Sequence, residues 1–114
     1  MSDHGPGLVL VLSSFPEGHE AQELARALVS ERLAACVQVS TPIASTYIWK
    51  GVLETAQEVM LHCKTTSERA EALAARLRAL HPYATPEIVT IAADACHPAY
   101  LAWVRENTAA GESA

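Results

Sequence analysis

The side chains best suited to chemistry gather in the segment from His81 to Glu87, which reads HPYATPE. A neutral imidazole at His81 can coordinate Cu(II) or another divalent cation, whereas the protonated ring can cap the carboxyl end of a helix that stops at Pro82. One histidine is a poor metal site by itself, and no other histidine is spaced to join it through local structure. The pattern therefore favours capping, and a metal site at His81 would have to be assembled by folding or between subunits.

A second set of polar side chains belongs to one predicted strand. Glu58 and Lys64 stand near its opposite ends on the same, even-numbered side. With Tyr83 and Glu87, Lys64 can bind a small anionic molecule, and Glu87 with His81 can hold a metal ion. The favoured alternative is a solvated lysine at a strand end. Glu58, Lys64 and Tyr83 also carry acid–base groups that an enzyme could use, although no spacing in the sequence requires it.

The three cysteines, Cys36, Cys63 and Cys96, are odd in number and widely separated. Such spacing predicts neither a disulfide framework nor a zinc knuckle, and it is typical of reduced thiols in a cytoplasmic protein. Cys36 follows a pair of alanines at the start of a predicted strand, where a small buried side chain packs well. An inert core cysteine is the favoured interpretation, and a metal-ligand or redox role for Cys36 is the alternative.

The elements that would position these residues follow from hydrophobic periodicity. Strand patterns cover residues 8–12, 36–49, 52–64 and 88–91, and helical spacing covers residues 21–33, 70–80 and 98–107. Pro42 requires a sheet edge or a bulge in the second strand, and Thr65 and Glu68 stand at capping-box spacing before the second helix. This order predicts an α+β fold, a ferredoxin-like βαββαβ sandwich with a long hairpin between its second and third strands and a C-terminal helix.

Length and composition limit the classes of protein that this chain can represent. With 114 residues, 50% of them hydrophobic, it forms a single domain over residues 1–114, and we expect residues 1–7 and 108–114 to be flexible. The formal net charge of -5 and the absence of a basic cluster argue against nucleic acid and anionic membranes as partners. The apolar run at 8–12 is too short for a signal peptide or a membrane span, so we expect a cytoplasmic protein.

Association between chains is expected because two helices can cover only one face of such a sheet. The other face and the hairpin would leave large apolar side chains in water, which usually marks an interface. Tyr47 and Trp49 in the hairpin are predicted interface anchors, and Trp103 is a core or interface residue. A sandwich of this length uses its core for packing, so a ligand site is expected in a cleft between subunits.

Five segments resemble the CutA (divalent-cation tolerance) family in order and spacing. They are Glu31–Val37, Ser45–Gly51, Glu58–Thr65, His81–Ile88 and Tyr100–Trp103. Two positions depart from the family pattern, since Gln38 replaces the usual Asn and Ser13 stands where some members have a Cys. The second departure weakens any proposal of a thiolate–copper site at that position.

The resemblance implies a ferredoxin-like homotrimer akin to the PII signalling proteins, with clefts between its subunits. It also implies a link to copper and other divalent cations, and no catalytic activity. The favoured function is a trimeric cation-responsive protein that binds a divalent metal cation or a small anionic ligand. The alternatives are a scaffold or signalling protein that binds another protein, and an enzyme that uses Lys64, Tyr83 and Glu58.

Overall fold

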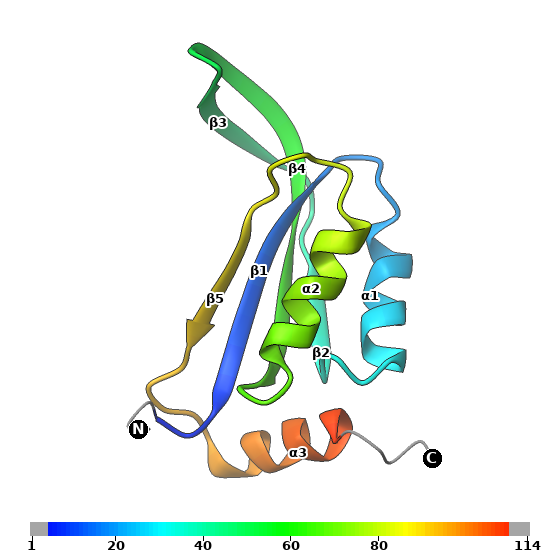
Figure 1. Ribbon diagram of the computed structural model, residues 1–114, viewed down its shortest axis with the longest axis vertical. Helices are drawn as coiled ribbons and strands as arrows, with labels where there is room; N and C mark the ends of the chain where they lie inside the picture. Colours follow the sequence, from blue (N-terminus) through cyan, green and yellow to red (C-terminus); the bar gives the residue numbers. More distant parts are fainter. Residues whose placement is uncertain (1–4, 110–114) are drawn as a thin grey trace.

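The computed structural model describes residues 5–109, which form one antiparallel sheet and three helices (Figure 1). The elements in chain order are β1 (Leu8–Pro16), α1 (Ala21–Ser30), β2 (Cys36–Val39), β3 (Ile43–Trp49), β4 (Val52–Thr66), α2 (Ala70–Leu80), β5 (Ile88–Ala92) and α3 (Pro98–Thr108). The strand order is β2-β4-β1-β5, with β3 also paired with β4. Both α1 and α2 cover one face, and α3 crosses the end of the sheet farthest from the hairpin (Figure 1). The predicted ferredoxin-like sandwich is confirmed. Among the described residues, no helix is long and apolar enough to cross a membrane.

The core lies between the sheet and the two covering helices. Because side chains alternate along a strand, the odd-numbered residues of β1 and β4 point at the helices. The buried side chains that meet there include Val9, Val11, Phe15, Leu61 and Cys63 from the sheet and Leu24, Leu28, Leu73 and Leu77 from the helices. A second cluster, formed by Leu8, Ala35, Leu101 and Val104, fixes α3 across the end of the sheet.

The opposite face of the sheet is not covered by any element of the described residues (Figure 1). The register places Leu10 opposite Ile91 and Leu12 opposite Val89, so these side chains share that face. Met60 joins them from β4. We call these five residues the open face. Its apolar side chains are half-buried or exposed, as predicted for a surface that another chain would cover.

The long strand predicted over residues 36–49 is two strands, with a β-bulge at Thr41 and Pro42 between them. Val39 pairs with Leu61 and Ile43 pairs with Glu58, so four steps along one strand match three along the other. Ser40 maintains the connection, because its hydroxyl accepts the Met60 N–H at 2.8 Å. Of the two possibilities expected at Pro42, a sheet edge or a bulge, the register shows a bulge. The prediction of one continuous strand is wrong, because proline cannot donate to the ladder.

The bulge changes which face the odd-numbered residues occupy. Val37 and Val39 lie opposite the core residues Cys63 and Leu61, on the helix-covered side. Beyond the extra residue, Ile43 lies opposite Glu58 and Tyr47 opposite Glu54, on the other side of the sheet. A one-residue shift in register always exchanges the two faces. The bulge thus places the odd-numbered hairpin residues on the same face as the carboxylates of β4.

Two other boundaries differ from the sequence-based expectation. Strand β1 continues past Leu12 to Pro16, because Ser13 and Phe15 are buried and the pairing with β4 extends to Glu58. The capping box is wrong, since Thr65 belongs to β4 and its hydroxyl donates to the Leu33 carbonyl at 2.7 Å, inside the core. A buried carbonyl gains more from this hydroxyl than the exposed helix terminus would.

The chain ends were expected to be flexible over residues 1–7 and 108–114. Residues 1–4 and 110–114 lie outside the described residues. Within the described part, the Gly7 carbonyl accepts the Ser67 N–H at 2.9 Å. Thr108 is the last residue of α3, where it is buried and donates its hydroxyl to the Val104 carbonyl.

Candidate functional site

A cleft of about 690 Å³ opens at the base of the hairpin arm, which we define as β3 with residues 52–58 of β4. The arm projects beyond the rest of the sheet (Figure 1). The cleft is lined by Ser14, Ser45, Thr46, Tyr47, Trp49, Glu54, Glu58, Pro82, Tyr83, Ala84, Thr85 and Glu87. Three parts of the chain that are distant in sequence, namely β1, the hairpin arm and the loop between α2 and β5, meet at this point.

Glu58 and Tyr83 both line the cleft and are bonded to each other. The Tyr83 hydroxyl donates to Oε2 of Glu58 at 2.8 Å, and Glu58 is only 8% exposed. Desolvation has the largest effect on the pKa of Tyr83, and the hydrogen bond to Glu58 and the negative charge of Glu58 act in the same direction. Together they raise the pKa of Tyr83 to about 12. Tyr83 therefore stays protonated at neutral pH and acts as a hydrogen-bond donor rather than as a base.

Carboxylates dominate the charge of the cleft. Glu54, Glu58 and Glu87 line it, and none of its lining residues is a Lys, Arg or His. Glu87 is held in place by β1, because the Ser14 hydroxyl donates to its Oε1 at 3.2 Å and the Ser13 hydroxyl donates to its carbonyl at 2.8 Å. Desolvation and the charges of Glu54 and Glu58 raise the pKa of Tyr47. Such a cleft favours cations over anions.

His81 lies beside the cleft and uses both of its ring nitrogens. Nε2 is 2.7 Å from the Ser14 carbonyl, so it donates there, and Nδ1 accepts the Tyr83 N–H at 3.2 Å. The ring stacks on Phe15, with centroids 4.1 Å apart. Desolvation lowers the pKa of His81, although the hydrogen bond to Ser14 opposes this effect. The neutral ring therefore links β1 to the loop that carries Tyr83.

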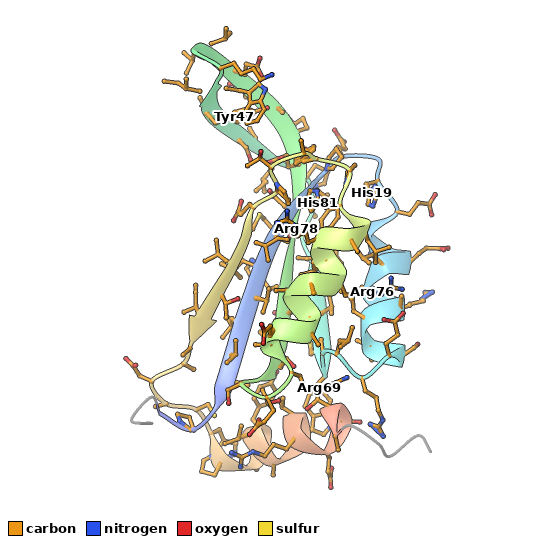
Figure 2. All side chains as sticks on the ribbon, viewed as in Figure 1. His19, Tyr47, Arg69, Arg76, Arg78 and His81 are labelled. Atoms are coloured by element: carbon orange, nitrogen blue, oxygen red, sulfur yellow. The ribbon has the colours of Figure 1, made fainter. Side chains whose placement is uncertain are left out.

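This geometry bears on the two roles considered for His81, which are capping of the end of α2 and coordination of a metal ion. The ring contacts Ser14 of β1 and the backbone of Tyr83, and the backbone N–H of His81 itself donates to Arg78 at the end of α2. A metal ion could bind the imidazole only if one of its two hydrogen bonds opened. His19 is the histidine that folding brings near it, stacked on Phe15 with centroids 5.1 Å apart (Figure 2).

Lys64 lies apart from the other predicted binding residues. It pairs with Leu10 and Cys36, and its Nζ donates to Oε1 of Gln38 at 2.8 Å. Lys64 and Glu58 are six positions apart along β4, which corresponds to a distance of about 20 Å between them. Within one chain, therefore, the structure does not bring Lys64 to Tyr83. An anion site that uses both would need Lys64 from a second subunit, and an acid–base group of Lys64, Tyr83 and Glu58 is not assembled.

The cysteines are free and lie away from the cleft. Cys63 is fully buried. Burial, and to a smaller extent the nearby Cys36, raises the pKa of Cys63 to about 12, so its thiol is unreactive at neutral pH. Cys36 is half-buried at the start of β2, opposite Lys64. Across residues 5–109, no group of three or more His, Cys, Asp or Glu side chains is arranged to hold a metal ion.

Sequence reasoning missed Glu54, Ser14 and the cleft-lining role of Tyr47 and Trp49. The one usable signal was the even spacing of Glu54 and Glu58, which places both carboxylates on one face of β4. The aromatic residues could not be placed beside them, because the bulge at Pro42 reverses the faces of β3. Tyr47 lies on the hairpin arm in Figure 2, above the end of the sheet where His81 lies.

Comparison with known proteins gives one consistent result. Residues 9–107 match the family model described as "CutA1 divalent ion tolerance protein". The chain is 43% identical to "Divalent-cation tolerance protein CutA" of Thermus thermophilus over 99 residues, covering 87% of this chain and 96% of that protein. It is 39% identical to "Protein CutA" of Mus musculus, covering 94% of this chain but only 61% of the mouse protein. Its fold superposes on the crystal structure of CutA from Xylella fastidiosa with a TM-score of 0.86 and 39% identity, over 90% of this chain and 99% of that one.

Proposed function

The chain belongs to the CutA1 divalent ion tolerance family, and we propose that it is a cytoplasmic, non-catalytic homotrimer that binds a divalent cation in the cleft at the base of its hairpin arm. Through this binding it would take part in the response to metal ions. The observation that supports the proposal best is the charge of the cleft, where Glu54, Glu58 and Glu87 face no basic side chain among the lining residues.

The donor set indicates how such a cation would be held. Carboxylate oxygens suit hard divalent cations, whereas Cu(II) prefers imidazole nitrogen. One subunit offers an incomplete set, since no three ligating side chains converge within residues 5–109. We therefore place the cation between subunits, with Glu58 and Glu87 supplying the first ligands. Cu(II) would additionally require His81 to release Ser14 or Tyr83.

The trimer is supported by two apolar surfaces. The open face leaves Val89 and Ile91 exposed, and the hairpin arm exposes Ile48 and Leu53 at its tip. Burial of such surfaces is the main driving force for association. Because the arm extends beyond its own sheet, it is placed to reach a neighbouring subunit, which would then close the cleft from the outside.

Calorimetric titration with Mg²⁺, Zn²⁺ and Cu(II) tests the site. We expect at least one of these cations to bind the wild-type protein, and Glu58→Gln to weaken that binding about tenfold or more, because it removes a charged ligand. Glu23→Gln changes the net charge equally on the exposed side of α1 and should have no effect. Equal affinities in the two variants would rule out the cleft as the cation site.

The role of His81 in Cu(II) binding is tested separately. If the imidazole coordinates Cu(II), binding must weaken as the pH falls through the pKa of His81, which desolvation holds below its ordinary value of 6.5, and His81→Ala should abolish it. If His81→Ala keeps the wild-type affinity for Cu(II), the ring acts only as the link between β1 and the Tyr83 loop.

A further inference from the structure

We infer that the same cleft binds organic ammonium ions, such as alkylated or methylated amines, as a ligand class distinct from metal cations. This inference rests on the cation site proposed above, because it uses the same carboxylates. It depends on three features of the cleft: its aromatic side chains, the unbonded oxygen of a buried carboxylate, and its size.

Aromatic side chains line the cleft from two separate parts of the chain. Tyr47 and Trp49 line the cleft from β3, and Tyr83 lines it from the loop before β5. The faces of such rings carry negative potential and attract organic cations, and cages of this kind recognise methylated ammonium groups. One cation of the chain already lies near the ring of Trp49, because Nζ of Lys50 is 5.8 Å from its centroid.

Glu58 supplies a negative charge in the cleft, and within the described residues only one of its two carboxylate oxygens has a hydrogen-bond partner. The residue is 8% exposed, and its Oε2 accepts the Tyr83 hydroxyl. No hydrogen bond or ion pair within residues 5–109 involves its Oε1, although Glu58 lines the cleft. No fully buried side-chain oxygen within the described residues lacks a partner, so Oε1 is open to solvent and accessible to a cation that enters the cleft.

Size and geometry distinguish an organic ammonium ion from a bare metal ion. A metal ion needs several ligand atoms that converge at about 2.0–2.6 Å, and no three ligating side chains do so within the described residues. The cleft of about 690 Å³ is large for one metal ion but falls in the range of small-molecule sites. An ammonium ion requires only negative charge and ring faces, which are both present.

Tryptophan fluorescence gives a direct measurement. The chain has two tryptophans, Trp49 in the cleft and Trp103 on α3, so Trp103→Phe leaves Trp49 as the single reporter. Tetramethylammonium chloride is the probe, and tert-butanol is its neutral control of similar size, with NaCl at matched ionic strength. We expect saturable quenching of Trp49 by tetramethylammonium and none by tert-butanol or NaCl.

Variants in the Trp103→Phe background locate the binding. Glu58→Gln and Tyr47→Leu should each weaken tetramethylammonium binding about tenfold, since each removes one attractive group, whereas Glu23→Gln should leave it unchanged. If Glu58→Gln unfolds, Glu87→Gln on the exposed side of the cleft gives the same comparison. Circular dichroism checks that each variant is folded.

The outcomes separate this inference from the proposed function. Quenching by tert-butanol equal to that by tetramethylammonium overturns the inference, as does unchanged binding in Glu58→Gln. A cleft filled by a neighbouring subunit would give no saturable quenching and would overturn it too. Divalent cation binding without ammonium binding defeats only the ammonium inference, and the reverse result defeats only the divalent cation proposal.

Discussion

The side chain of His81 is held from several directions, since both ring nitrogens are hydrogen-bonded and the ring stacks on Phe15. Nδ1 can accept the Tyr83 N–H only while the ring is neutral. Protonation would break this bond and place a charge beside Phe15. The protonation state of His81 should therefore affect how firmly the loop that carries Tyr83 is held.

We predict that the stability of the protein decreases as the pH falls below 6.5, and that His81 contributes to this decrease. The folded state lowers the pKa of His81 from its ordinary value of 6.5. Below pH 6.5 the unfolded chain therefore binds a proton that the folded chain resists, so the free energy of unfolding falls; above 6.5 this residue contributes no pH dependence. Urea midpoints between pH 5 and 8 should show a steeper slope for the wild type than for His81→Gln. Parallel slopes would contradict the prediction.

The pair formed by Tyr83 and Glu58 gives a second prediction at this scale. Tyr83→Phe should lower the free energy of unfolding by about 1–3 kcal/mol, because a largely buried carboxylate loses its donor. Tyr100→Phe is the matched control, since no hydrogen bond of the Tyr100 hydroxyl is found within residues 5–109, and a shift within about 0.5 kcal/mol is expected. Urea unfolding at pH 7.5 measures both. A loss of the same size in the two variants would show that the bond adds nothing.

At the scale of the element, the hairpin arm depends on its turn. Lys50 and Gly51 both have positive φ angles, 53° and 81°, as a type I′ turn requires. The mirror-image turn matches the right-handed twist of the two strands, which lets β3 and β4 pair without a break as far as Trp49 and Val52.

We predict that Gly51→Ala weakens the arm by about 1–2 kcal/mol through backbone strain alone. No atom lies within 4 Å of the position that the added Cβ would occupy, so packing does not contribute. Lys50→Asn is the opposite change, because asparagine tolerates a positive φ, and it should strengthen the arm. Amide hydrogen exchange at the Ile48–Leu53 pair should become faster in the first variant and slower in the second. Unchanged exchange in both would mean that the turn does not limit opening of the arm.

The same elements show what the sequence predicts and what it does not. Apolar periodicity predicted the order of strands and helices, because burial of one face requires it. The bulge was predicted from Pro42, but its effect on β3 was not, since reversal of the faces depends on how the partner strand is matched. Lys64 was grouped with Tyr83 as a possible site for an anionic ligand, whereas Tyr83 bonds to Glu58 and Lys64 lies six positions farther along β4, opposite Leu10. Cleft residues from β1, the arm and the Tyr83 loop meet only through tertiary structure.

At the scale of the whole molecule, the open face is the apolar surface that the proposed trimer would bury. We predict that Val89→Glu prevents formation of the proposed trimer, because a charge would have to be buried in an apolar interface. Val29→Glu is the matched control: Val29 is 40% exposed and Val89 43% exposed, but Val29 lies on α1, on the helical side of the sheet. Sedimentation velocity at micromolar concentration should give a monomer for the first variant and a trimer for the second. A trimer in both cases would place the interface elsewhere.

The central position of β1 also has a consequence for the order of events during folding. Val9 pairs with Thr65 on one side and Ala92 on the other, so both neighbours of the first strand come from much later in the chain. Contacts between residues so distant in sequence form slowly, because long loops must close first. During synthesis, β1 therefore cannot complete its pairing with β5 until residue 92 has been added. The first strand to be made is therefore among the last to be completed.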